Sequence, residues 1–139
     1  MDEHESLARA WFAKAEADLR SADHLLTMTD PAYETIGFHA QQCAEKYLKG
    51  YLVLHGVTFK KWHDLGYLLD LCVTLTSRWE RLYDEAEFLS PFATEYRYPD
   101  LLVKFTREQA NRSIQIARQI RQAVLDELES DASKESPSP

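Results

Sequence analysis

Glycine and proline are scarce in this sequence, with 4 Gly and 5 Pro among 139 residues. Turn-rich β architectures depend on these two residue types, so their scarcity argues against an all-β fold. The glycines are Gly37, Gly50, Gly56 and Gly66. Their wide spacing excludes a glycine-rich phosphate-binding loop.

Long apolar runs are also missing, and none approaches the ~20 residues that a membrane span requires. The segment Met1–Ser6 is acidic, whereas a secretory signal begins with basic and then apolar residues. The two cysteines, Cys43 and Cys72, lie within apolar helical patterns. We therefore expect reduced core cysteines in a cytoplasmic protein that has no membrane association.

The balance of charge is acidic, with 16 basic and 23 acidic residues and a net charge of −7. This balance excludes a globally basic nucleic-acid coat protein but not a local basic patch. Six basic and two acidic residues lie between Arg97 and Arg121. Because these arginines fall on more than one helical stripe, the segment indicates nucleic-acid binding only weakly.

Apolar residues recur at helical spacing along most of the chain, and no strand-like alternation of useful length is present. The pattern predicts helices over about 3–28, 31–55, 64–76, 77–89 and 106–129. Helices of these lengths joined by short loops pack as an antiparallel up-and-down bundle. We expect one all-α domain over residues 1–129 and a disordered C-terminal tail over residues 130–139, which are small and polar.

Several helix starts carry capping signals. Asp30 before Pro31 and Asp64 before Leu65 are typical N-caps. The segments Ser77–Glu80 and Thr106–Gln109 have the spacing of a capping box.

The first candidate site is a polar stripe on the most apolar helix, made by His39, Gln42, Lys46 and Lys49, with Glu45 beside it. Spacings of three and four place these side chains on one face. Such a stripe could hold a phosphate or a partner's carboxylate, or it could be an ordinary solvated face. A polar seam on an apolar helix faces either a cleft or a symmetry mate.

The second candidate is the segment Lys60–Asp64, where two lysines, Trp62 and His63 precede a helix. Cations, a ring that can stack and an imidazole at a helix start suit an anion or a nucleotide. The alternative is a solvated loop in which Asp64 caps the helix and Trp62 packs on the edge of the core.

The third candidate is the segment Tyr96–Asp100, where Arg97 lies between two tyrosines and Pro99 restricts the loop. The arginine could contact a phosphate or a base, or it could anchor its own loop. Zinc-site histidine spacing and a nucleophile-elbow serine are both missing. We therefore expect no metal and no cofactor.

Four segments occur in an order that resembles the HEPN domain, whose name abbreviates higher eukaryotes and prokaryotes nucleotide-binding. They are Trp11–Leu19, Phe38–Leu52, His63–Leu65 and Arg97–Asp100, and the resemblance extends over roughly 7–128. It implies an all-α bundle that commonly dimerises. Many small prokaryotic members pair with a minimal nucleotidyltransferase and behave as toxin–antitoxin systems.

One departure from the family pattern bears on activity. RNase-active relatives carry an arginine followed, after four to six residues, by a histidine near the start of the final helix. The matching arginine is Arg97, but the positions for the histidine hold Leu102, Val103 and Lys104. The chain also lacks the Gly-Ser and paired-Asp pattern of a nucleotidyltransferase.

Two readings follow from this departure. The first is a non-catalytic HEPN protein that forms a homodimer and binds a nucleotide, RNA or a minimal nucleotidyltransferase. The second is an RNase toxin with a non-standard acid–base pair, formed by Arg97 with Tyr98 or His63. The residues expected to contact a ligand or partner are Gln42, Lys46, Lys49, His63, Arg97, Tyr98 and Asp100.

Overall fold

The computed structural model describes residues 2–94 and 105–135. These residues form five α-helices and two 3-10 helices, with no strand among them. The elements are α1 (Glu3–Leu26), α2 (Tyr33–Leu54), α3 (Leu65–Val73), η1 (Ser77–Leu82), α4 (Tyr83–Leu89), η2 (Ser90–Ala93) and α5 (Arg107–Glu135). The predicted all-α helical bundle is confirmed.

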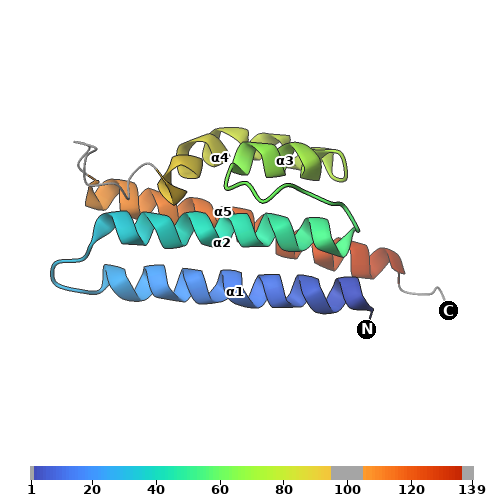
Figure 1. Ribbon diagram of the computed structural model, residues 1–139, viewed down its shortest axis with the longest axis horizontal. Helices are drawn as coiled ribbons and strands as arrows, with labels where there is room; N and C mark the ends of the chain where they lie inside the picture. Colours follow the sequence, from blue (N-terminus) through green and yellow to red (C-terminus); the bar gives the residue numbers. More distant parts are fainter. Residues whose placement is uncertain (1, 95–104, 136–139) are drawn as a thin grey trace.

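Helix α2 lies at the centre of the bundle. Figure 1 shows α1, α2 and α5 as long, roughly aligned rods, with α3 and α4 covering α2 from the opposite side to α1. Helix α2 contacts α1, α3, α5 and η2. Much of its apolar surface is buried, because the exposed fraction does not exceed 2% at Ile36, Ala40, Cys43, Ala44, Tyr47 and Tyr51.

The capping signals had mixed outcomes. Asp64 accepts hydrogen bonds from the backbone N–H groups of Gly66 and Tyr67, as predicted. The Thr106 hydroxyl accepts from the Gln109 N–H, while the Gln109 side chain accepts from the Thr106 N–H. This reciprocal pair confirms the second capping box.

Other helix limits differ from those predicted. Helix α2 begins at Tyr33 after an N-cap at Ala32, so Asp30 is not its cap. The residue before Ser77, Thr76, is the N-cap of a 3-10 helix and makes no side-chain capping bond. Helix α5 continues to Glu135, so residues 130–135, expected in the tail, are helical.

The helices in the described residues were compared with the length and apolar composition of a membrane span. None of them combines the length and the low charge that crossing a membrane requires.

Candidate functional site

The connection between α2 and α3 runs back along α2 before α3 begins (Figure 1). It is anchored at both ends by backbone groups. The Val57 N–H donates to the Leu52 carbonyl at 2.9 Å, and the Lys60 N–H donates to the Tyr67 hydroxyl at 2.9 Å. The loop therefore places Lys60–Asp64 over the middle of the bundle.

His63 is the residue of this loop that is held most closely by α2. Its Nδ1 lies 2.9 Å from Oε1 of Glu45, and its backbone carbonyl accepts from Nε2 of Gln41 at 3.0 Å. The His63 side chain is nevertheless 56% exposed. An exposed imidazole is thus fixed at both its ring and its backbone by residues of the central helix.

The two residues that hold His63 are buried. Gln41 is 0% exposed, and the Glu45 side chain is 3% exposed. Gln41 also donates to Oε1 of Glu45 at 3.3 Å and accepts from Nε2 of Gln42 at 2.8 Å. These bonds form a continuous polar chain from Gln42 to His63.

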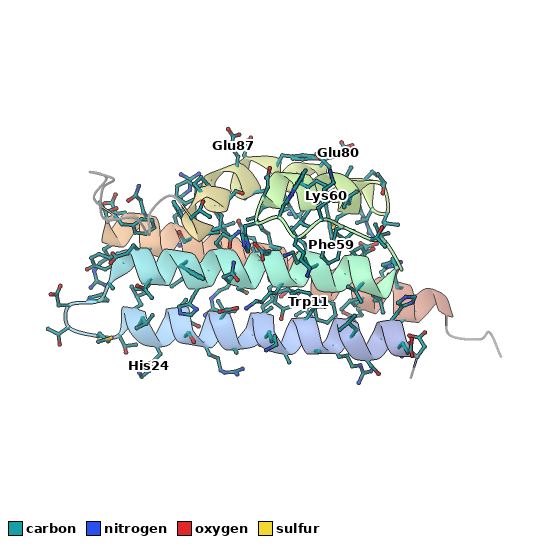
Figure 2. All side chains as sticks on the ribbon, in the orientation of Figure 1. Trp11, His24, Phe59, Lys60, Glu80 and Glu87 are labelled. Atoms are coloured by element: carbon teal, nitrogen blue, oxygen red, sulfur yellow. The ribbon has the colours of Figure 1, made fainter. Side chains whose placement is uncertain are left out.

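Lys49 completes this polar chain from the other side of Glu45. Its Nζ lies 3.1 Å from Oε2 of Glu45, and its side chain is 8% exposed. The ammonium also lies 5.7 Å from the ring centroid of Trp11 and 5.8 Å from that of Phe59. Figure 2 shows these two aromatic residues, from α1 and from the loop, beside α2. We call Gln41, Gln42, Glu45, Lys49 and His63 the polar network.

An open hollow of about 470 Å³ lies next to His63. Its lining combines the loop with η2 and the residue after η2, and comprises Lys61, Trp62, His63, Asp64, Ser90, Pro91 and Thr94. The Ser90 hydroxyl accepts from the Leu65 N–H at 3.0 Å, which ties this wall to the start of α3. The hollow therefore offers a cation, an imidazole and hydroxyl groups to a ligand.

Trp62 is the exposed aromatic residue at this hollow, with 47% of its surface accessible. The Lys60 ammonium lies 4.5 Å from its ring centroid, and the Tyr67 ring lies at 4.7 Å. These contacts with Lys60 and Tyr67 leave about half of Trp62 exposed and able to stack on a ligand.

The predicted polar stripe on α2 divides into two separate groups. Lys49 belongs to the polar network, whereas the Lys46 ammonium lies 2.6 Å from Oδ2 of Asp18 on α1. His39 contributes its Nδ1 to the same carboxylate, at 2.9 Å from Oδ1. The structure thus brings Gln42, Lys49 and His63 together and directs Lys46 to α1. Arg97, Tyr98 and Asp100 lie outside the described residues.

The basic segment of the last helix is largely paired within the molecule. Arg118 pairs with Asp23, and Arg121 makes two 2.9 Å bonds to the carboxylate of Glu16. The hydrogen bond from Arg121 lowers the pKa of Glu16. Arg107 and Arg112 lie over the rings of Tyr33 and Phe88. The described arginines of this segment are therefore engaged in contacts within the bundle.

The cysteines are free and buried, as the apolar patterns predicted. Burial raises the pKa of Cys43 and raises the pKa of Cys72 to about 12. A thiol with a raised pKa is a poor nucleophile at neutral pH. Within residues 2–94 and 105–135, no group of three His, Cys, Asp or Glu side chains is arranged to hold a metal ion.

Gln41 is the member of the polar network that the sequence interpretation missed. Gln41, Glu45 and Lys49 recur every four residues, which places all three on one face of α2. That spacing was the available signal. The spacing did not indicate a buried network, because polar residues at helical spacing usually face solvent. Here the α2–α3 loop covers them.

Comparison with known proteins gives the class of this chain. Residues 8–128 match the HEPN domain, and the chain belongs to this family. It is 26% identical to "Putative toxin MJ1304" of Methanocaldococcus jannaschii, over 87% of this chain and 88% of that protein.

Two solved structures share the fold at 30% identity. They are TT1696 from Thermus thermophilus, with a TM-score of 0.72, and ST0689, an archaeal HEPN homologue, with a TM-score of 0.69. Each comparison covers 86% of this chain and 96% of the other.

Proposed function

We propose that this protein is the HEPN member of a toxin–antitoxin-like pair, and that it binds a nucleotide or a minimal nucleotidyltransferase without cleaving RNA. The similarity to a protein named as a toxin supports the assignment to a toxin–antitoxin-like pair. The binding surface is the hollow beside the α2–α3 loop.

The observation that carries the proposal is the presentation of His63. Its exposed ring is fixed by buried Glu45 next to Lys61 and Trp62 at the start of α3. Imidazole and ammonium groups suit a phosphate, and an indole ring suits stacking with a base. This combination matches the chemistry of a nucleotide.

The sequence around Arg97 supports the part of the proposal that excludes RNA cleavage. The positions at which RNase-active relatives carry a histidine hold Leu102, Val103 and Lys104, none of which is an acid–base group suited to neutral pH. An arginine without an imidazole can bind a phosphate but lacks the group that transfers the proton.

Calorimetric titration with AMP and ATP tests the binding site. We expect His63→Ala to weaken binding about tenfold or more, as for loss of a charge-assisted hydrogen bond. His24→Ala is the matched control, because His24 is exposed on α1 and lies away from the loop (Figure 2). Equal affinity in the wild type and His63→Ala would exclude this site.

A second candidate function is RNA cleavage that uses His63. The 2.9 Å contact between His63 and Glu45 favours it, because a carboxylate that orients an imidazole is a common acid–base arrangement. The purified protein should leave single-stranded RNA intact if the first proposal holds. Metal-independent cleavage that is lost in His63→Ala would establish the second function instead.

A further inference from the structure

We propose that Glu45 and Gln41 are positioning residues that present the Nε2 atom of His63 to the phosphate group of the ligand. This inference rests on the proposed nucleotide-binding function and assigns a role to two buried residues. His63 makes the contact, and the two α2 residues act through it.

His63 is held by α2 at two independent points. Glu45 contacts the ring at Nδ1, and Gln41 donates to the backbone carbonyl of the same residue. One bond would leave the ring or the backbone free to rotate. Two bonds from adjacent turns of one rigid helix fix both the place and the direction of the imidazole.

The contact with Glu45 also fixes the position of the proton on the His63 ring. A carboxylate only accepts hydrogen bonds, so the hydrogen in the contact between His63 and Glu45 belongs to Nδ1. In the neutral ring, Nε2 then carries the lone pair. When the ring is protonated, Nε2–H becomes a donor to a phosphate oxygen while Nδ1–H remains on Glu45.

Burial of the polar network has a cost in free energy. Gln41 and the Glu45 side chain are almost wholly removed from water, and Lys49 accompanies Glu45. Buried charges are often replaceable by apolar residues without loss of stability. A bond to a ring that is 56% exposed adds little stability in return, because water can replace it. The arrangement is better explained by orientation of His63 than by stability.

The surroundings of the ring point to an anion. Among the described residues, Glu45 contacts the ring and is itself paired with Lys49, while Lys61 and Asp64 of the loop line the same hollow as His63. The opposite wall, at residues 90–94, contributes hydroxyl groups from Ser90 and Thr94 to the hollow. Glu45 contacts His63 and Asp64 caps α3, so among the described residues that line the hollow Lys61 is the charge available to a ligand. A phosphate would meet an ammonium, an imidazole and hydroxyl donors together.

Nitrogen NMR of the His63 ring in the ligand-free protein tests the positioning directly. At a pH at which the ring is neutral, the wild type should show the Nδ1–H tautomer, and Glu45→Gln should lose this preference. Glu16→Gln is the matched control, because it removes another paired carboxylate, on α1. It should leave the His63 signals unchanged. An Nε2–H tautomer in the wild type would overturn the inference, whether or not the variants fold.

Titration with AMP and adenosine separates this inference from the proposed function. We expect AMP binding to weaken about tenfold in Glu45→Gln, and the weaker adenosine binding to stay the same. If AMP affinity falls in His63→Ala but both tautomer and affinity are unchanged in Glu45→Gln, positioning is wrong and the binding site stands. If the wild type shows the Nδ1–H tautomer but His63→Ala binds AMP with unchanged affinity, the proposed binding site is wrong. The proposed presentation of His63 to a phosphate is then wrong as well.

Discussion

At the scale of single residues, Lys49 makes the clearest contribution to stability that can be tested. Its ammonium and the Glu45 carboxylate form a pair from which water is nearly excluded. Lys49→Met should reduce the free energy of unfolding by about 3 kcal/mol, because it leaves an uncompensated buried charge. Guanidinium unfolding followed by circular dichroism measures this loss.

Two controls show whether burial of the charge is the cause. Lys46→Met breaks a more accessible pair, with 22% of the lysine side chain exposed, and should cost about 1 kcal/mol. The double variant Lys49→Met with Glu45→Gln should recover much of the lost stability, since neither charge remains. Equal losses for Lys46→Met and Lys49→Met would contradict the argument.

Glu16 provides a residue-scale prediction that depends on pH. The hydrogen bond from Arg121 lowers the pKa of Glu16, so the folded protein holds its proton less tightly than the unfolded chain. Its contribution to stability is therefore present above the unfolded pKa, about 4.3 for glutamate, and is lost as pH falls through the lower folded value. Wild type should exceed Glu16→Gln in stability at pH 7, and the difference should shrink towards pH 3. A constant difference would exclude this linkage.

The residues of the candidate site were predictable only in part. Lys49 was predicted as a site residue from its spacing on α2, and His63 from its place before a helix. The structure brings both residues into one polar network. The sequence could not show that Gln41 bonds to the His63 carbonyl, 22 residues away, because that contact depends on the path of the loop. It also could not show that Lys46 pairs with Asp18, because the register of α1 against α2 is set by packing.

At the scale of the helices, the two predicted capping boxes offer a matched comparison. Thr106→Ala removes the hydroxyl that accepts from the Gln109 N–H, and should lower the free energy of unfolding by about 1 kcal/mol. Ser77→Ala changes the same type of residue where Thr76, not Ser77, is the N-cap. Its cost should stay within about 0.5 kcal/mol. Thermal unfolding of the two variants checks both values, and equal losses would contradict the difference in capping.

The helices were predictable because each buries an apolar stripe with a period near 3.6 residues. Their ends were less predictable, as the differences at Ser77 and Glu135 show. Capping motifs are local signals. A segment with the spacing of a capping box can therefore form a 3-10 helix when it lies next to a turn. The polar composition after Ser130 indicated disorder, but residues 130–135 continue a helix whose preceding turns are buried against α2.

For the whole molecule, the remaining prediction concerns association. Part of the polar seam on α2 that suggested a symmetric partner is satisfied inside the chain, because Lys46 pairs with Asp18 and Lys49 with Glu45. The prediction of a homodimer therefore rests on what the resemblance to the HEPN domain implies. Large exposed apolar side chains in the described residues are dispersed over separate elements, at Leu7, Met28, Trp62 and Leu75.

Because these apolar residues come from separate segments of the described part of the chain, we expect a largely polar dimer interface whose strength falls as salt is added. Light scattering coupled to size-exclusion chromatography should give twice the chain mass of 16.1 kDa at low salt, and a lower average mass as protein is diluted or salt is raised. A mass of 16.1 kDa at every protein concentration would contradict the homodimer. A dimer that is indifferent to salt would instead indicate that association depends on apolar contacts.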